Sequence, residues 1–357
     1  YYDPERFLPL FVRAKPLGFL VIALSVQLAL WILLLHQGGD FKAWKEKGLF
    51  RAPAVALLAL YALFLFVALS RIGLTRDTAY WAQPGVALQG WQFLLALIVG
   101  VLAYLFFLKY PAEKSDFLIA FFIWGAAVAI WWSVPMDALK HSFYAPYAYP
   151  LGKPLPYSDA GFYDYLSQGL LLGSGFLSSI PPRPLYVVFL AGLRALVGIN
   201  NYDGIMLGQT LLYALFPVTL YLLSKRIHSR AAGVLVAFFG IFREWTNLLV
   251  ASQTRVSNSR MTLTDIPTAL VLGLAALFII YWLQQDDRQP ARLFRAGGIF
   301  GILLLLRTQS MLILPLVILL ILIIFFPNWK QWAKMTAILL LGVALVVSPW
   351  LIRNASI

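Results

Sequence analysis

Long apolar runs alternate with short polar or basic stretches along most of the chain. A helix of about 20 apolar residues crosses a hydrocarbon core of roughly 30 Å. The pattern predicts ten membrane-spanning helices. They lie at 17–36, 52–70, 92–109, 117–133, 205–224, 232–249, 263–284, 296–308, 310–327 and 335–352. The predicted fold class is therefore all-α, a polytopic membrane protein.

The apolar run from Gly297 to Phe326 is too long for one untilted crossing. Arg307 lies inside it and Pro315 follows. A charge at the centre of a bilayer is costly, and proline disfavours a continuous helix. The run is therefore predicted to form a hairpin with Arg307 at its tip, where the arginine serves either function or a structural ion pair.

Residues 134–204 interrupt the pattern because they are rich in Pro, Tyr, Gly and Ser. Within them, Gly161–Leu172 and Leu185–Val197 have the spacing of amphipathic helices, and we expect them to lie along the membrane surface. The interruption predicts three parts. They are a four-helix membrane segment (1–133), an extracytoplasmic loop with surface helices (134–204) and the C-terminal membrane helices (205–357).

Composition agrees with a membrane location. Of the 357 residues, 61% are hydrophobic and 12% are charged, which excludes an ordinary soluble domain and a disordered chain. The net charge of +13 fits basic cytoplasmic loops better than nucleic-acid binding. Cysteine is absent and the three histidines lie far apart, so no metal site is indicated, although a divalent metal is compatible with the pattern. No glycine-rich nucleotide loop is present, and we expect no cofactor to be required.

Basic residues also predict the orientation. The short loop Lys225–Arg230 carries three of them, and the loops 285–295 and 328–334 are basic as well. Short basic loops stay in the cytoplasm. Because successive spans alternate in direction, residues 134–204 are then outside. We expect a plasma or inner membrane protein whose candidate site faces the exterior or periplasm.

Ionisable residues gather at this outer face. Arginine binds phosphate through a planar fork of donors, and a carboxylate can accept a proton from an attacking hydroxyl. Carboxylates and arginines at one face therefore suit a site that handles a phosphate and moves a proton. The candidates are Asp159, Tyr163, Asp164, Arg183, Arg260, Asp265, Arg307 and Arg353.

Simpler structural roles stay open for several of these residues. Asp159 could cap the surface helix that follows it. Asp164 could be a solvated surface residue. Asp265 could complement the dipole of the next helix. Arg260 and Arg353 could extend their charged ends to the membrane interface.

Five stretches resemble the GT-C superfamily of membrane glycosyltransferases, in particular the bacterial and archaeal branch related to protein mannosyltransferases and aminoarabinose transferases. No one of them is decisive, but their order and spacing are specific. The stretches are Ser158–Tyr163 with Gly173–Phe176, Arg183–Tyr186, Ser259–Pro267, Leu306–Pro315 and Pro349–Asn354.

The resemblance implies transfer of a sugar from a polyprenyl-phosphate carrier to an acceptor protein, lipid or glycan, with inversion at the anomeric carbon. By the same resemblance, Asp159 is the general base and Asp265 a second catalytic carboxylate. The remaining implied roles are donor-phosphate binding by Arg260, Arg307 and Arg353, and substrate binding by Tyr163, Asp164 and Arg183. Implied partners are the lipid donor, the acceptor, membrane lipids and other subunits of a membrane complex, but no nucleic acid.

Two alternatives remain. Asp159 is followed by Ala160, so the acidic pair found in many family members is missing, which favours a non-catalytic structural subunit. The second carboxylate must otherwise come from Asp164 or Asp265. A transporter or flippase fits less well, because no internal repeat is evident and Arg307 is the only candidate mid-membrane charge.

Overall fold

The computed structural model describes residues 58, 61–62, 65–66, 88–110, 116–139, 147–148, 153–154, 156–176, 180–252, 256–285 and 287–356. The chain divides into two compact units, Tyr1–Pro84 and Gly85–Ile357. The first two predicted spans, 17–36 and 52–70, lie outside the described residues, apart from the five helical positions between 58 and 66. The predicted division into three parts stays a prediction.

The second unit is helical, which confirms the predicted all-α class. Its only described strands are the antiparallel pair β1 (Tyr147–Ala148) and β2 (Lys153–Pro154). The α-helices are α4 (Gly90–Lys109), α5 (Asp116–Trp132), α6 (Asp159–Leu171), α7 (Pro184–Val197), α8 (Tyr202–Tyr213), α9 (Leu215–Ile227), α10 (Arg230–Val250), α11 (Asp265–Leu283), α12 (Pro290–Leu306), α13 (Leu314–Phe325) and α14 (Trp329–Ala355). Two 3₁₀ turns, η2 (Met136–Leu139) and η3 (Thr308–Ile313), complete the described elements.

Six helical stretches in the described residues are long and apolar enough to cross a membrane. They are α4, α8 with α9, α10, α11, η3 with α13, and α14. The protein is therefore a membrane protein, while the count of ten spans stays a prediction. The expected span 205–224 consists of two helices that meet at Ala214. Pro217 explains this break, because it has no N–H to bond the carbonyl of Tyr213.

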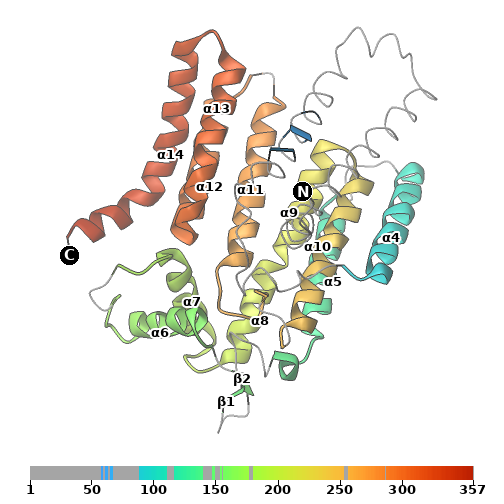
Figure 1. The fold of residues 1–357 in the computed structure, drawn as a ribbon, viewed down its shortest axis with the longest axis vertical. Helices are drawn as coiled ribbons and strands as arrows, with labels where there is room; N and C mark the ends of the chain where they lie inside the picture. Colours follow the sequence, from blue (N-terminus) through green and yellow to red (C-terminus); the bar gives the residue numbers. More distant parts are fainter. Residues whose placement is uncertain are drawn as a thin grey trace, which may run out of the picture. The chain divides into compact units, whose positions relative to one another are not determined.

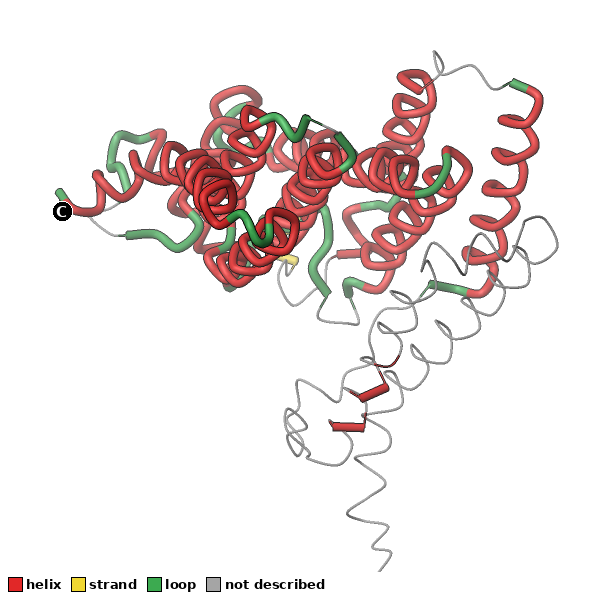
Figure 2. Tube along the Cα trace, turned by 90° about the horizontal axis from the view of Figure 1, so that it is seen from above, coloured by secondary structure: helices red, strands yellow, loops and turns green. Residues whose placement is uncertain are grey.

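The long helices lie side by side (Figure 1). Contacts run from α13 through α14, α12, α11, α9 and α10 to α4, while α5 packs on α9 and α10. Figure 2 shows many of these helices end-on. Glycines allow the closest approach, because Gly297 and Gly301 of α12 face α14 around Gly342, where no Cβ would fit. This contact holds α12 firmly against α14.

Helices α6 and α7 lie at one end of the long helices, the lower end in Figure 1. They correspond to the two predicted surface helices. Helix α7 packs on α8 and α12. A buried apolar cluster joins both helices to the α10–α11 connection and to α12. Its members include Tyr163, Leu166, Tyr186, Leu190, Met261 and Leu306. The polar candidate residues lie around this cluster.

Candidate functional site

Asp265 and Arg307 form an ion pair between α11 and α12. Asp265 is the first residue of α11, and Arg307 follows α12 with an extended backbone (φ −157°, ψ 107°) before η3. The helix therefore ends at Arg307, where the hairpin tip is predicted. The two side chains remain 43% and 34% exposed. Both charged groups are thus within reach of a ligand.

Tyr163 lies among charged residues from three segments. Arg183 donates a hydrogen bond to its hydroxyl, and the guanidinium carbon lies 5.4 Å from the ring centroid. The charges of Asp159 and Asp265 also act on the phenol. Burial raises the pKa of Tyr163, and Arg183 opposes that effect. The hydroxyl therefore stays neutral at physiological pH and can both donate and accept a hydrogen bond.

Asp159 presents an exposed carboxylate at the start of α6. It makes no hydrogen bond or ion pair within the described part of the chain, so no contact there supports the capping role. The backbone beside it is strained, because Ser158 has φ 56° and ψ −132°, a region that favours glycine. Arg183 also has a positive φ, of 68°. Strained residues of this kind cluster at functional sites.

The connection between α10 and α11, residues 256–264, ties several helices together. The Ser259 N–H donates to Glu244 of α10, and the Thr262 hydroxyl donates to the carbonyl oxygen of Ala160 in α6 at 3.0 Å. Asp265 follows directly. The connection therefore links the start of α6 to the start of α11, the two places where the candidate carboxylates Asp159 and Asp265 lie.

Arg260 does not extend to the membrane interface, since only 3% of the residue is exposed. Its guanidinium donates to the carbonyls of Trp131, Trp132 and Val134 at the end of α5 and lies 4.5 Å from the Trp132 ring centroid. Carbonyls at a helix C-terminus stabilise a cation. Burial lowers the pKa of Arg260 to about 10, which leaves it charged at neutral pH. Its predicted binding of phosphate stays a prediction.

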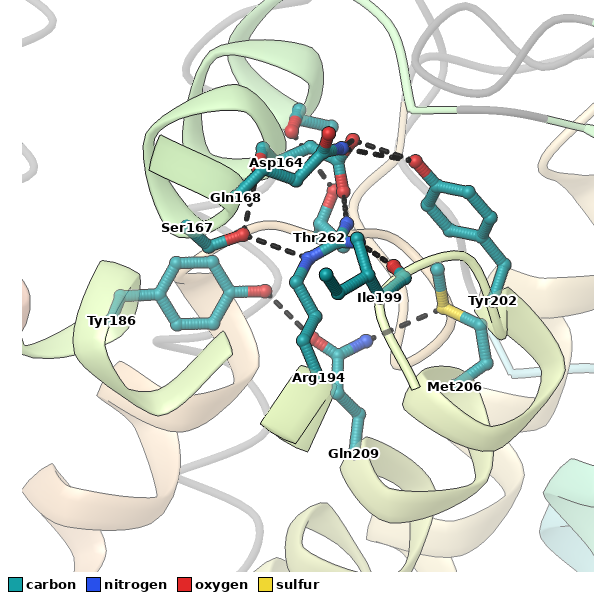
Figure 3. A network of polar contacts seen from close by, with 11 residues as sticks. Asp164, Ser167, Gln168, Tyr186, Arg194, Ile199, Tyr202, Met206, Gln209 and Thr262 are labelled. Atoms are coloured by element: carbon teal, nitrogen blue, oxygen red, sulfur yellow. Dashed lines mark hydrogen bonds and ion pairs between the residues drawn. The ribbon is translucent and has the colours of Figure 1, made fainter. Parts of the chain in front are cut away.

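Asp164 is not a solvated surface residue, because it is 93% buried within a polar network (Figure 3). Arg194 of α7 forms an ion pair with it, and the Tyr202 hydroxyl donates to it at 2.8 Å. Gln168 donates to the same carboxylate at 3.0 Å, while Arg194 also donates to Ser167 at 2.9 Å. The network joins α6, α7 and α8, and its predicted contact with substrate remains untested.

Arg353 lies near the end of α14, against the loop that follows α6. Its guanidinium carbon is 5.0 Å from the ring centroids of both Phe176 and Trp350, and it donates to Asn354 at 3.1 Å. These contacts attach α14 to the Gly173–Phe176 turn. They neither bring Arg353 to Arg307 nor test its predicted binding of phosphate.

An apolar cavity of about 500 Å³ is lined by close sequence neighbours of Asp265 and Arg307. Leu306, which precedes Arg307, and Pro267, two residues after Asp265, line it. Tyr186, whose ring packs edge-on against Tyr163, lines it as well. From there it extends between α7, α9, α11 and α12. The remaining residues that line it are all apolar except Thr219. Charged groups and an apolar cavity are therefore adjacent.

Residues 181–352 match the family model described as dolichyl-phosphate-mannose-protein mannosyltransferase. The match supports a membrane glycosyltransferase of the GT-C type. No curated protein and no solved structure matches the chain. The matched region contains Arg183, Asp265 and Arg307, but it begins after Asp159 and Tyr163. The family match therefore gives no support to the predicted roles of those two residues.

The described residues of the chain contain no group of three or more His, Asp or Glu side chains that could hold a metal ion. Positive charge near the candidate carboxylates comes from Arg307 and Arg183. These side chains can neutralise a phosphate without a bound cation.

Two buried ionisable residues of the chain were not among the predicted site residues. Arg194 is a lone cation in an otherwise apolar helix, and Glu244 is a carboxylate inside a predicted span. Such residues usually have a buried partner or a function. The signal was present in the sequence, but it identified neither Asp164 as the partner of Arg194 nor Ser259 as the partner of Glu244.

Proposed function

We propose that this protein transfers a sugar from a polyprenyl-phosphate-linked donor to an acceptor at the outer face of a cell membrane. The observation that carries the proposal is the partly exposed Asp265–Arg307 pair, whose sequence neighbours Pro267 and Leu306 line an apolar cavity of about 500 Å³. A lipid-linked sugar has the same two parts, a charged phosphate and an apolar chain. The family match of residues 181–352 supports the same class of reaction.

Arg307 is the best-placed phosphate ligand. The Arg307 side chain is 34% exposed, and its guanidinium can exchange part of its contact with Asp265 for contacts with phosphate oxygens. Arginine pairs with phosphate through two parallel N–H donors. Arg260 and Arg353 lie against protein carbonyls and aromatic rings, so in this mechanism they hold helices in place and add positive charge at longer range.

Asp159 is the proposed general base. It would accept the proton of the acceptor hydroxyl as that oxygen attacks the anomeric carbon, opposite the departing phosphate. The bond between the anomeric carbon and the phosphate oxygen breaks as the new glycosidic bond forms, and the lipid phosphate leaves with that oxygen. Attack from the opposite face inverts the anomeric centre through an oxocarbenium-like transition state. Arg307 stabilises the negative charge on the leaving lipid phosphate. Asp265, which already accepts a hydrogen bond from Arg307, orients that guanidinium.

The proposed outward orientation follows from the opposite end of the helices. Lys225 and Arg230 meet Asp116 there, within the short basic loop and its neighbours. Basic loops favour the cytoplasmic side. The Asp159, Asp265 and Arg307 end would then face the exterior or periplasm.

A structural subunit without catalytic activity is the second candidate. It is favoured by Asp164 and Arg260, which are both buried and bonded to protein groups. A fold that has lost its chemistry would keep such contacts and would have no need of the exposed Asp159 or the open Asp265–Arg307 pair.

Sugar transfer in proteoliposomes tests the proposal, using a panel of polyprenyl-phosphate sugars and three proteins. These are the wild type, Asp159→Asn and the control Asp287→Asn, which removes an exposed carboxylate from the α11–α12 connection. We expect transfer by the wild type and the control but not by Asp159→Asn. Transfer that survives in Asp159→Asn would remove Asp159 as the base. Folded wild type without transfer from any donor would favour the structural subunit.

A further inference from the structure

Glu244 is a buried carboxylate in the last third of α10, with 5% of the residue exposed. One carboxylate oxygen accepts the backbone N–H of Ser259, and the other accepts Nδ2 of Asn247 at 3.0 Å. No Lys or Arg forms an ion pair with it among the described residues. A buried charge is costly unless hydrogen bonds compensate it. These two hydrogen bonds, together with the positive charge of the neighbouring Arg243, therefore stabilise the carboxylate.

The contact with Ser259 anchors the connection 256–264 at its middle. On one side of this anchor, Asn258 accepts the backbone N–H of Arg260 at 3.0 Å. On the other side, Arg260 reaches α5, Thr262 reaches α6, and Asp265 reaches α12. The last three contacts go to three different parts of the molecule: the end of α5, the start of α6 and the residue after α12. The position of the connection thus determines how α6 and α11 meet.

The connection has few other polar bonds that could replace this anchor. The side-chain atoms Ser259 Oγ, Asn258 Nδ2 and Thr264 Oγ1 are buried and make no hydrogen bond with the described residues. Ser259 and Thr264 are completely buried. The contact of the Ser259 N–H with Glu244 therefore matters more than a single hydrogen bond would in a well-bonded loop.

We infer that Glu244 is a positioning residue that fixes the 256–264 connection and thereby the relative placement of Asp159 and Asp265. It touches no reacting atom and acts through Ser259 and Thr262. The inference rests on the proposed function for its activity readout. Its structural part can be measured without any substrate.

The chemistry of the site supplies a specific test. In Glu244→Gln the new amide has one donor side, so whichever way it turns, an NH₂ group faces either the Ser259 N–H or the Asn247 NH₂. The double variant Glu244→Gln/Asn247→Asp restores an acceptor opposite that NH₂, and this acceptor can also keep the bond from Arg243, which donates to Asn247 at 3.1 Å in the wild type. Asn247→Asp alone sets two carboxylates against each other and completes a double-mutant cycle.

The expected kinetic result is a loss of kcat of about 100-fold in Glu244→Gln, because a small displacement of reacting groups has that effect. The KM for the donor should stay within about twofold, since Arg307 is untouched. The double variant should recover kcat to within about tenfold of the wild type. The matched control is Thr246→Val, a buried residue of α10 that bonds Gln92 of α4 at 3.0 Å and makes no hydrogen bond to the described residues of the connection.

Hydrogen–deuterium exchange of the same proteins keeps the two proposals separable. In Glu244→Gln, peptides that cover 256–264 and the start of α6 should exchange faster, with recovery in the double variant and no change in Thr246→Val. If the wild type is active and Glu244→Gln has a near-normal kcat, the inference is overturned. It is also overturned if the double variant has a kcat no higher than that of Glu244→Gln. If the wild type transfers no sugar, the proposed function fails and the exchange result alone decides the anchor: unchanged exchange in Glu244→Gln overturns it.

Discussion

The end of the molecule that carries α6 and α7 contains two ion pairs of opposite character. Asp164 and Arg194 have side chains that are 10% and 0% exposed, whereas the side chains of Asp265 and Arg307 are 43% and 34% exposed. Further hydrogen bonds from Tyr202 and Gln168 complete the first pair. Close sequence neighbours of the second pair line an apolar cavity.

This difference distinguishes a structural contact from a site that can bind a ligand. A buried pair in which each charged nitrogen and oxygen already has a protein partner holds helices together and offers no group to a ligand. A half-exposed arginine can exchange its carboxylate for the phosphate of a lipid. The burial of each pair, rather than the presence of charge, therefore decides which one belongs to the candidate site.

The largest expected effect is on stability, from breaking the buried pair. Arg194→Met leaves the Asp164 carboxylate buried without its cation, which should cost about 3–5 kcal/mol in the free energy of unfolding. The midpoint of thermal unfolding in detergent measures this. Replacing both partners, in Asp164→Leu/Arg194→Met, should recover most of the loss. A single variant as stable as the wild type would show that the pair does not hold α6 to α7.

The open pair should behave in the opposite way. Arg307→Gln should lower kcat/KM by about 100-fold or more, because a donor aimed at the leaving phosphate is lost. The free energy of unfolding should fall by less than about 1 kcal/mol, since partly exposed pairs contribute little. Arg307→Lys keeps the charge but loses the planar pair of donors. Its kcat/KM should lie between those of the wild type and Arg307→Gln. An Arg307→Gln protein that loses several kcal/mol of stability but retains its kcat/KM would show that the exposed pair, too, has a structural role.

Tyr163→Phe should have a smaller effect. It removes the hydroxyl that accepts the bond from Arg183, and we expect kcat/KM to fall about tenfold. Because burial raises the pKa of Tyr163, its hydroxyl is neutral well above physiological pH. The pH profile of transfer should therefore keep its shape from about pH 6 to 9 in the variant. A profile whose basic limb moves would assign a titrating role to the phenol.

The smallest effect is expected at the opposite end of the helices. Lys225→Met removes one of two cations that share Asp116, while Arg230 keeps a bond of 2.7 Å to that carboxylate. The free energy of unfolding should change by at most about 1 kcal/mol, and the rate of sugar transfer should not change. A loss of transfer in this variant would place a functional group at the end assigned to the cytoplasm.

Much of the fold could be predicted because membrane spans depend on the length of apolar runs. The hairpin at Arg307 followed from the cost of a charge at mid-membrane. The break between α8 and α9 at Ala214 was missed, since Pro217 lies in a run of sufficient overall hydropathy. Mean hydropathy does not register the loss of a single backbone donor.

The candidate site could be predicted only as a set of residues at one end of the helices. Alternation of spans brings Asp265 and Arg307 to the same end, whatever the details of packing. The partner of Asp164 depends on how α6 and α7 rotate against each other, which the packing of Tyr186 and Leu190 decides. The target of Arg260, the end of α5, is likewise a tertiary contact across more than 120 positions. Neither follows from local sequence.

The most direct test of the account is the affinity of the purified protein for a short-chain polyprenyl phosphate, measured by titration of intrinsic tryptophan fluorescence in detergent. Wild type and Lys225→Met should bind equally. Arg307→Gln should bind at least about tenfold more weakly, because it loses a charged phosphate contact. Equal affinity in all three proteins would contradict the claim that the open pair receives the phosphate of the lipid donor.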